Sequence, residues 1–239
     1  MLDYTNSVPL HVQLKKIIEK QVENGELQGQ IPSERQFMHT YNVSRSTVRE
    51  AITLLVREGI VEKRHGKGTF VSLKPIHDWL GNLRSTTETI QNMGMEPGAQ
   101  LITNYKTITP SYIQEQTGLR EAYFIKRIRY ADQIPIGVER HYYPIWIGEK
   151  LLQYDLNNAT LYDLLENKLG ITFAEADQTI SSGHIYEEDR PYLCIEREKH
   201  VLIAKRIIKN GAGEIIEFEE AFYRSDLYAF KIKLSRKFG

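Results

Sequence analysis

The 239-residue sequence predicts an α+β protein with a small helical N-terminal domain and a larger antiparallel-sheet C-terminal domain. Residues 1–71 contain three helix-like apolar patterns followed by a short basic hairpin. Residues 83–239 contain runs rich in Ile, Val, Tyr, Phe and Thr, which turn residues and short helical patterns separate. Pro75 interrupts both kinds of pattern, so we assign residues 72–82 to a linker. The length suits two modest domains.

Three helices are expected in the N-terminal domain, over residues 9–24, 33–41 and 44–58. The apolar stripe of the first consists of Leu10, Leu14, Ile17, Ile18 and Val22. Ser33 and Ser44 can cap the second and third helices, which a tight two-residue turn separates. Two short helices joined in this way are typical of a helix-turn-helix, which places its second helix in the major groove of DNA.

The third helix has the side chains that such a groove-reading element needs. Arg45 and Arg49 are four residues apart and share a face, next to Ser44 and Thr47 in the first turn. Short donors at a helix N-terminus suit phosphate, and arginine suits the edge of guanine. Taken alone, an arginine on a helix is more often a solvated side chain without a partner.

A basic hairpin over residues 59–71 follows this helix. Its turn contains Gly66, Lys67 and Gly68, and glycines at these positions can adopt positive φ and let the backbone approach a ligand. Arg64 and Lys67 add positive charge, so the hairpin would serve as a wing on the DNA backbone or in the minor groove. The alternative is a solvated hairpin beside an ordinary helical pair.

The charges are unevenly distributed along a chain whose formal net charge is zero. Residues 1–75 contain 11 Lys plus Arg against 8 Asp plus Glu, and the remaining residues contain 20 against 23, which fits DNA affinity confined to one end. The single cysteine, Cys194, excludes an internal disulfide, and we expect it in the core. No apolar run approaches about 18 residues and no signal peptide is recognisable, so we expect a cytoplasmic protein without a membrane partner and without a cofactor.

The C-terminal domain is expected to be a meander of strands with short helices, which indicates an antiparallel α+β fold. The strands are placed at residues 101–109, 123–131, 135–143, 173–186, 200–209, 214–223 and 228–234. The helices are placed at residues 85–93, 110–117, 146–154, 161–169 and 187–194. Hairpin turns are expected at residues 132–134 and 210–213.

Two helix starts and a pair of arginines in this domain could hold an anion. Ser85 and Thr160 each stand three residues before an acidic residue, which is the capping-box spacing, and helix N-termini can receive phosphate. Simple capping is the alternative for either helix. Arg127 and Arg129 are two residues apart in a predicted strand and therefore share a face. Two arginines on one face repel unless a carboxylate or a bound anion compensates; the alternative is that both are solvated.

Carboxylates on neighbouring strands could complete a sugar site. Glu139 shares the arginines' face if the preceding hairpin loop has three residues, whereas a two-residue loop turns it to the opposite face, and the sequence leaves both open. Glu217, Glu219 and Tyr223 share one face of their strand, where they could bind hydroxyl groups or could equally face solvent.

Both halves of the chain resemble known families. The PSER motif and the VSRSTVREAITLLVREGIVEKRHGKGTFV stretch resemble the GntR family of bacterial transcription regulators over residues 9–71. Residues 83–239 resemble the UTRA effector domain of the HutC subfamily, which has a chorismate-lyase-like fold. The second match is carried by Leu83, residues 85–88, 94–98 and 160–163, the IKRIRYAD-IP hairpin and the AFYRSDLY stretch.

The resemblance implies roles for particular residues. The residues that would contact operator DNA are Arg35, Arg45 and Arg49, with Gly66, Lys67 and Gly68 as the tip of the wing. In relatives that respond to phosphosugars, the phosphate is held by residues matching Ser85, Thr87, Arg127, Arg129, Thr160 and Tyr162. The sugar hydroxyls are met by residues matching Glu139, Glu217 and Tyr223.

The sequence as a whole favours a homodimeric repressor that a phosphorylated sugar releases from an inverted-repeat operator. The alternatives are a regulator of a non-sugar carboxylate, a metabolite-binding enzyme-like domain fused to a DNA-binding head, and an architectural DNA binder without an effector. The enzyme alternative lacks a nucleophile–base pair, a metal-ligand spacing and a Gly-rich phosphate loop in the sequence, so we expect no enzymatic activity.

Overall fold

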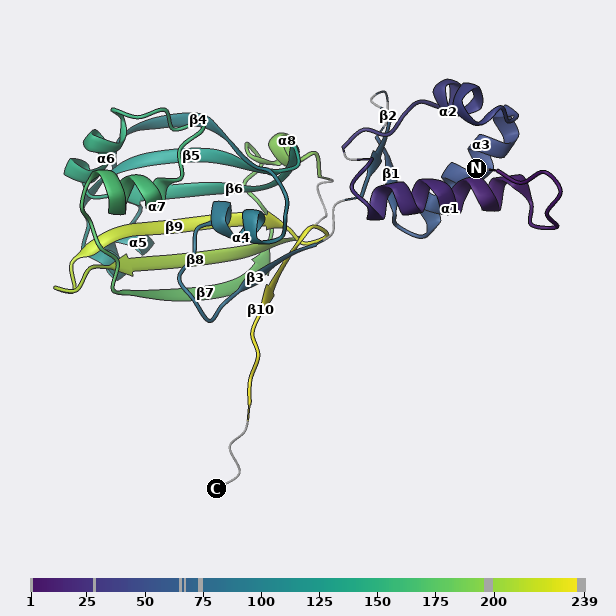
Figure 1. Cartoon of the computed structure of the whole chain (residues 1–239). Helices are drawn as coiled ribbons and strands as arrows, with labels where there is room; N and C mark the ends of the chain where they lie inside the picture. Colours follow the sequence, from purple (N-terminus) through teal and green to yellow (C-terminus); the bar gives the residue numbers. More distant parts are fainter. Residues whose placement is uncertain are drawn as a thin grey trace. The chain divides into compact units, whose positions relative to one another are not determined.

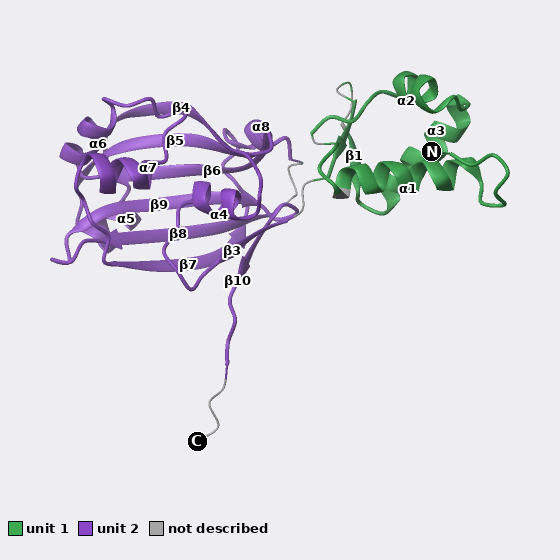
Figure 2. Ribbon diagram, in the orientation of Figure 1, with its two compact units in different colours: residues 1–74 green, residues 75–239 purple. Residues whose placement is uncertain are grey.

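The computed structural model describes residues 2–27, 29–64, 66, 68–72, 75–195 and 200–235. The chain divides into two compact units, residues 1–74 and 75–239 (Figure 2). Of the expected wing residues, Lys67 lies outside the described residues, and so does the side chain of Arg64. No helix in the described part of the chain is long and apolar enough to cross a membrane.

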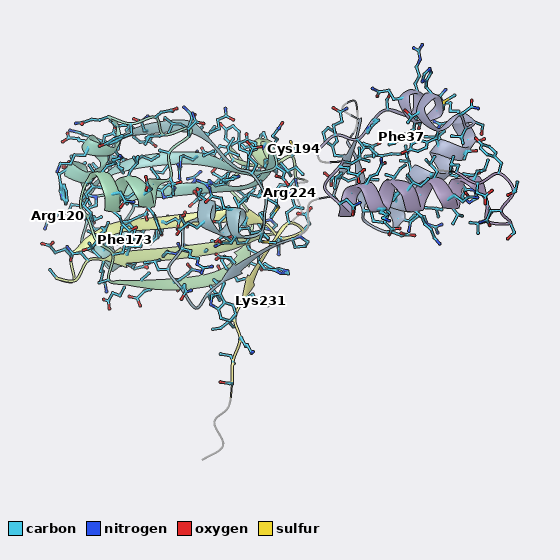
Figure 3. The ribbon with its side chains drawn as sticks, in the orientation of Figure 1. Phe37, Arg120, Phe173, Cys194, Arg224 and Lys231 are labelled. Atoms are coloured by element: carbon cyan, nitrogen blue, oxygen red, sulfur yellow. The ribbon has the colours of Figure 1, made fainter. Side chains whose placement is uncertain are left out.

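The first unit consists of three helices and a hairpin. Its elements, at the purple to blue end of the chain in Figure 1, are α1 (Leu10–Glu23), α2 (Glu34–Tyr41), α3 (Arg45–Arg57), β1 (Val61–Arg64) and β2 (Gly68–Val71). Leu14 and Ile18 of α1, Phe37 of α2 and Leu55 of α3 are at most 3% exposed and belong to one cluster (Figure 3 labels Phe37). The apolar stripes of the three helices therefore meet in a shared core.

Side-chain caps explain where α2 and α3 begin. The Ser33 hydroxyl accepts a hydrogen bond from the backbone N–H of Gln36, and the side-chain oxygen of Gln36 accepts one from the backbone N–H of Ser33. Asn42 then adopts a left-handed conformation with a φ of 51°, which ends α2 and turns the chain. The Ser44 hydroxyl accepts from the N–H of Thr47 at 3.2 Å and begins α3. Both expected caps are confirmed.

The second unit is built on a six-stranded antiparallel sheet with the strand order β4-β5-β6-β9-β8-β7. The strands are β4 (Pro97–Ile108), β5 (Glu121–Ala131), β6 (Ile134–Tyr143), β7 (Glu175–Gly183), β8 (Val201–Lys209) and β9 (Ile215–Arg224). The helical elements are α4 (Thr86–Asn92), α5 (Ser111–Thr117), α6 (Ile145–Leu151), α7 (Leu161–Asp163), the π-helical turn η1 (Leu164–Lys168) and α8 (Arg190–Leu193). The predicted α+β class with an antiparallel sheet is confirmed.

Helices cover both faces of this sheet. Ile125 of β5 clusters with Ile147 of α6 and Leu165 of η1, so these elements cover the face of β5 that also carries the arginine pair. On the opposite face, Phe124 of β5 clusters with Ile113 of α5. A polar site on the arginine face is therefore enclosed between the sheet and its helices.

The segment expected to be a linker over residues 72–82 contains a strand. It holds β3 (Ile76–Trp79), which pairs in parallel with β10 (Tyr228–Lys231). The Tyr228 hydroxyl donates to Asp78 Oδ2 at 3.0 Å, and both residues are buried. The linker expectation is therefore wrong for residues 76–79, because a strand whose partner lies 150 residues away leaves no local pattern that marks it as a strand.

Three further local expectations are wrong. Thr160 makes no capping hydrogen bond, because α7 is only three residues long before it passes into η1. The helix expected over residues 187–194 is reduced to α8, which Cys194 ends with a left-handed φ of 53°. Cys194 is exposed instead of lying in the core (Figure 3), since the turn after α8 leaves its side chain at the surface.

The hairpin between β5 and β6 decides where Glu139 points. Its loop consists of two residues, Asp132 and Gln133, both with positive φ. A loop of this length would by itself turn Glu139 away from the arginine pair, because a shift of one residue in register moves every side chain to the opposite face. The hairpin turn expected at residues 132–134 is present but is one residue shorter, since Ile134 already belongs to β6; this decides the loop length that the sequence left open.

A β-bulge in β6 nevertheless brings Glu139 to the arginines. Ile136 is an extra residue on β6, between Pro135 and Gly137, which pair with consecutive residues of β5. Beyond the bulge the register is shifted by one residue. Glu139 therefore lies directly opposite Arg127 and shares its face.

Candidate functional site

The first unit presents an arginine-rich surface at the start of α3. The side chains of Arg45 and Arg49 are 68% and 63% exposed, and the Nε atom of each lies within 3.4 Å of a Glu34 carboxylate oxygen. Arg35 on α2 is exposed as well. Because exposed ion pairs contribute little to stability, phosphates or base edges can replace the Glu34 carboxylate at small cost. This surface has the form of a nucleic-acid interface.

The hairpin turn beside this surface requires its two glycines. Gly66 has a φ of 69° and Gly68 a φ of 116°, and both values favour glycine. A Cβ on Gly68 would also lie 2.6 Å from Nε2 of Gln30. The segment before α2 supports the hairpin, because the N–H of Ile31 donates to the carbonyl of Thr69. The expected wing is a braced hairpin rather than a free loop.

In the second unit, strand register brings polar residues from several strands into rows on one sheet face. The rows are Gln178–Arg206–Glu219–His141 across β7, β8, β9 and β6, Arg127–Glu139 across β5 and β6, and Arg129–Gly137–Tyr223 across β5, β6 and β9. Successive rows are two residues apart along each strand, so all these side chains point to the same side. The site is thus assembled by the pairing of strands and does not correspond to a single sequence motif.

A small cavity lies above these rows, between the sheet, the start of α4 and α7. Its volume is 20 Å³, which is room for about one water molecule. Its lining consists of Ser85, Thr86, Thr87, Arg127, Arg129, Glu139, His141, Thr160, Leu161, Tyr162, Arg206 and Glu219. Arg127, Arg129 and Glu139 are each only 2% exposed. The site is therefore a small cavity lined by buried charges.

Arg127 and Arg129 share one carboxylate and keep donors unused. Arg127 Nη1 donates to the carbonyl of Ala159 at 2.9 Å, and Arg129 Nη2 donates to Thr87 Oγ1 at 2.7 Å. Glu139 Oε2 lies 3.6 Å from Arg127 Nη2 and 3.7 Å from Arg129 Nε. The Nε atoms of both arginines are buried and form no hydrogen bond within the described residues. A bound anion would satisfy these donors.

Arg206 closes the site on the side of β8. Its Nη1 donates to the Tyr162 hydroxyl at 2.9 Å and to the carbonyl of Arg84 at 3.2 Å, and its Nε donates to Gln178 Oε1 at 2.5 Å. Glu219 Oε2 lies 3.6 Å from Arg206 Nη1. Unlike in the other two arginines, the Nε of Arg206 has a hydrogen-bond acceptor.

Opposite charges determine the ionisation of His141 and Glu139. Burial alone would lower the pKa of His141, but the Glu139 carboxylate 3.4 Å away and the hydrogen-bonded Glu217 carboxylate raise it to about 9. Burial alone would raise the pKa of Glu139, but the Arg129 guanidinium, with His141 beside it, holds that pKa well below its usual range. His141 is therefore protonated and Glu139 ionised near neutral pH.

The cluster as a whole carries an excess of positive charge near neutral pH. Burial lowers the pKa of Arg127 to about 10, so this guanidinium remains charged. Burial raises the pKa of Glu219 to about 7 against the opposing effect of Arg206, so its carboxyl group is only partly ionised. Arg127, Arg129, Arg206 and His141 then outweigh three carboxylates. The electrostatics favour an anionic ligand.

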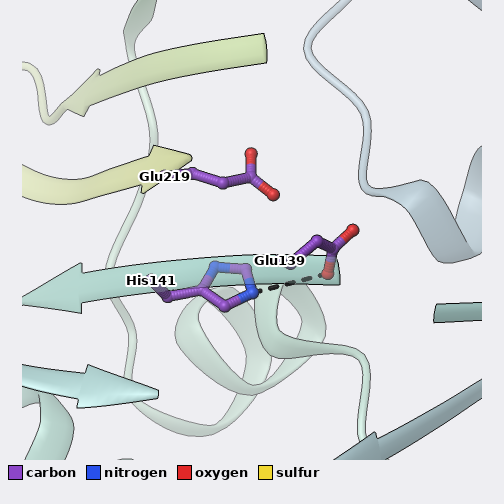
Figure 4. A group of neighbouring side chains, drawn as sticks. All are labelled: Glu139, His141 and Glu219. Carbon is purple, nitrogen blue, oxygen red and sulfur yellow. Dashed lines mark ion pairs between the residues drawn. The ribbon is translucent and has the colours of Figure 1, made fainter. Parts of the chain in front are cut away.

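Glu139, His141 and Glu219 also lie close enough to surround one ion (Figure 4). One ligand atom from each can be chosen so that all lie within 4.8 Å of one another, and His141 Nε2 is 3.4 Å from Glu139 Oε2. The same Glu139 oxygen, however, lies within 3.7 Å of guanidinium nitrogens of Arg127 and Arg129, which would repel a cation. The group suits hydroxyls of a ligand better than a metal.

The structure brings most of the predicted effector residues together. Those that line the cavity are Ser85, Thr87, Arg127, Arg129, Glu139, Thr160 and Tyr162. Glu217 and Tyr223 lie behind them: Glu217 Oε1 is hydrogen-bonded to His141 Nδ1 at 2.7 Å, and the Tyr223 hydroxyl donates to Glu139 at 3.1 Å. Ser85 uses its hydroxyl and its N–H within its own helix cap. Glu217, Tyr223 and Ser85 therefore act mainly as supports in this structure.

Three polar cavity residues, Thr86, His141 and Arg206, were not assigned a role from the sequence. Thr86 donates to Glu139 Oε1 at 2.6 Å and follows Ser85 directly. His141 lies two residues after Glu139, so the alternation within β6 was a usable signal. Glu219 could be placed on the correct face but not in the cavity. Arg206 could be found only from the pairing of β8 with β9.

Comparison with known proteins decides the family. Residues 10–71 match the bacterial regulatory proteins of the gntR family, and residues 92–229 match the UTRA domain. Over 231 residues the chain is 31% identical to the HTH-type transcriptional repressor NagR of Bacillus subtilis (strain 168), with 93% of each chain covered. The protein belongs to the GntR family. It is a DNA-binding transcriptional repressor of the HutC type, with a UTRA effector domain.

Other relatives agree with this assignment. The mannosyl-D-glycerate transport/metabolism system repressor MngR of Escherichia coli (strain K12) is 25% identical over 236 residues, covering 96% of this repressor and 97% of MngR. The crystal structure of PhnF from Mycobacterium smegmatis superposes with a TM-score of 0.66 at 22% identity, covering 94% of this chain and 100% of that one, and shows likeness of fold. Regulators of this family bind operator DNA and small-molecule effectors.

Proposed function

We propose that this repressor is a homodimer that binds an inverted-repeat operator and leaves it when a phosphorylated sugar binds in the cavity of the UTRA domain. The observation that carries the proposal is the arginine pair, Arg127 and Arg129, each 2% exposed and each with an Nε for which the described residues provide no acceptor. Buried donors of this kind are costly unless a ligand satisfies them. A phosphate supplies strong acceptor oxygens and the negative charge that balances the cluster.

The surroundings of the arginine pair offer room for the phosphate. A neighbouring cavity of 140 Å³ shares Thr87, Arg129 and Thr160 with the central cavity and adds Asn157 and Asn158. Their hydroxyl and amide groups are donors for phosphate oxygens. With the phosphate in this region, the sugar ring would extend over the central cavity, where carboxylates can accept hydrogen bonds from its hydroxyls.

The name of a relative supports sugar chemistry. MngR is by name the repressor of a mannosyl-D-glycerate transport/metabolism system, and this compound joins a sugar to a carboxylate. A carboxylate effector is accordingly the second candidate, because a guanidinium binds carboxylate and phosphate oxygens with the same charge-assisted hydrogen bonds. The arginine pair alone does not distinguish the two anions.

The position of the site along the chain supports a route to the DNA-binding unit. The chain enters the second unit at β3 and passes from there through a short loop into α4. Thr86 and Thr87, in the first turn of α4, contact Glu139 and Arg129 of the sheet. An effector that binds between α4 and the sheet would move α4 and favour a spacing of the two DNA-binding units that no longer fits the operator. For this it must bind that state preferentially.

A thermal-shift screen tests the ligand class. Purified repressor is mixed with sugar phosphates, with their unphosphorylated parents and with carboxylates, since a ligand that binds only the folded state raises Tm. We expect a rise with a sugar phosphate and none with its parent sugar. A rise with carboxylates alone would establish the second candidate and overturn the phosphate assignment. If the repressor sedimented as a monomer both alone and in complex with operator DNA, the homodimer proposal would be wrong.

Variants then test the site. Arg127→Ala combined with Arg129→Ala should abolish effector-induced release while operator binding is retained. Because this change leaves Glu139 buried without its guanidinium partners, Thr87→Val is the milder second variant, which removes only the hydroxyl that accepts from Arg129. Arg120→Ala, at an exposed arginine beside β5, is the matched control. Normal release by the folded double variant would show that the effector binds elsewhere.

A further inference from the structure

A larger cavity lies next to the effector site on the other side of Arg206. Its volume is 240 Å³, compared with 20 Å³ for the central cavity, and Arg206 lines both. Ala174, Ala176 and Gln178 of the β7 region line one side, and residues 79–83, between β3 and α4, line another. The phosphate and first sugar ring assigned above leave this space unfilled.

The polar row of the effector site continues into this cavity. His141, Glu219, Arg206 and Gln178 are successive cross-strand partners, so the row runs from the centre of the sheet to its edge strand β7. Gln178 Oε1 accepts from Arg206, whereas Gln178 Nε2 is buried and has no hydrogen-bond partner among the described residues. A buried amide N–H without an acceptor is uncommon, which indicates that a ligand or water supplies one here.

Arg206 forms a fixed wall between the two cavities. Its guanidinium donates to Tyr162, to the carbonyl of Arg84 and to Gln178, and its side chain is 12% exposed. These bonds engage Nε and Nη1 of Arg206, so its guanidinium is held in place between the two cavities.

The lining suits a hydroxylated ring. Gln178 offers a buried amide N–H, and Trp79 offers an aromatic surface. The carboxylate of Asp78, also in the lining, is already paired with the Tyr228 hydroxyl. A sugar ring has hydroxyls that accept from the amide and an apolar C–H surface that packs against an indole.

We propose that this cavity is a second sugar subsite and that the effector is a phosphorylated disaccharide or similar phosphorylated glycoside. This inference rests on the proposed function, since the arginine pair is taken to hold the phosphate. The phosphorylated ring occupies the central site, and the second ring lies against Trp79 and Gln178. The second ring thereby contacts residues 79–83, which lead from β3 to α4. Binding of this ring would therefore affect the part of the second unit that follows the connection to the DNA-binding unit.

Trp79 provides a direct reporter of this subsite. The chain has two tryptophans, and the other, Trp146 on α6, is 51% exposed, so Trp146→Phe leaves Trp79 as the single fluorophore with little disturbance. This full-length variant is titrated with glucose, mannose and glucosamine 6-phosphates, with maltose and cellobiose 6′-phosphates, and with the unphosphorylated disaccharides. Calorimetry gives the affinities in parallel.

We expect a phosphorylated disaccharide to bind at least about tenfold more tightly than any of the monosaccharide phosphates, as two or three added hydrogen bonds and a packed ring allow. Only the disaccharide phosphates should change the emission of Trp79. The unphosphorylated disaccharides should bind weakly, because they lack the group that the arginine pair holds.

One substitution locates the gain. Ala174→Trp fills the exposed rim of the larger cavity and should cancel the disaccharide advantage, while the affinity for monosaccharide phosphates stays unchanged. Thr179→Trp, at an exposed position on the other face of β7, is the size-matched control. The second subsite alone would be wrong if binding depended on the phosphate but disaccharide phosphates bound no more tightly than monosaccharide phosphates. The same would follow if Ala174→Trp kept the tighter binding of the disaccharide phosphates. Binding that is independent of phosphate would overturn the proposed function as well.

Discussion

Among single residues, His141 links two buried carboxylates. It is 3% exposed, its Nδ1 is hydrogen-bonded to Glu217 at 2.7 Å, and its Nε2 is 3.4 Å from Glu139. Burial favours the neutral ring, but the carboxylates outweigh burial and raise its pKa from 6.5 to about 9. Because the folded-state pKa is the higher one, the protonated ring stabilises the fold fully below pH 6.5, and this contribution is lost as the pH rises through 9.

We therefore expect the free energy of unfolding to fall by roughly 1–3 kcal/mol between these two pH values on account of His141. Urea unfolding at a series of pH values measures this change. His141→Gln, which cannot titrate, should be less stable than the wild type at the acidic end and should lack this component of the pH dependence. If the two proteins showed parallel curves across the range, the raised pKa would be wrong.

The site residues that could be predicted are those with a strong local pattern. Arg127 and Arg129 stand out because they are two residues apart in a strand rich in apolar residues. His141 directly follows Glu139 and Arg140, and Arg206 directly follows Lys205, so neither stands out from the charges beside it. They approach the same cavity only through the pairing of β6, β8 and β9. That pairing is a long-range property of the sheet, so spacing within one strand does not encode it.

Among the elements, α3 is the one that we expect to read the operator sequence. Arg49→Ala should weaken operator binding by about 1–3 kcal/mol, because a bidentate arginine contact with a guanine edge is lost, and should reduce discrimination against a scrambled duplex. Fluorescence anisotropy with both duplexes at one fixed salt concentration measures this. Arg57→Ala, at an exposed arginine at the other end of the same helix, is the control. If the ratio of the affinities for the operator and the scrambled duplex were unchanged in Arg49→Ala, Arg49 would not contribute to sequence recognition.

The limits of most elements could be predicted to within a few residues, whereas two features of their arrangement could not. Amphipathic alternation marks each strand of the main sheet. The bulge at Ile136 has no such mark, because an additional buried isoleucine looks like any other core residue, yet it alone brings Glu139 opposite Arg127. The strand β3 (Ile76–Trp79) is equally unmarked, since its stability depends on β10 at the far end of the unit.

On the scale of the whole molecule, the two-unit organisation follows from the change in composition, because helical periodicity gives way to strand patterns after the hairpin. The sequence does not reveal that the second unit begins and ends with paired strands. Since β3 pairs with β10, the residues next to the connection between the units are held by residues close to the C-terminus. The strands β3 and β10, the helix α4 and the larger cavity beside them therefore belong to one packed unit.

The small volume of the central cavity has a consequence for the speed of the proposed induction. With room for about one water molecule, it cannot admit a sugar phosphate until α4 or α7 moves away from the sheet. In stopped-flow mixing, we expect the observed rate of binding to rise with effector concentration and then to level off at the rate at which the protein opens. An observed rate that rises linearly at all concentrations would mean that the effector enters without such an opening. An effector that is present for less time than the protein needs to open would leave the repressor on its operator. Such a repressor therefore responds to the duration of the effector signal as well as to its concentration.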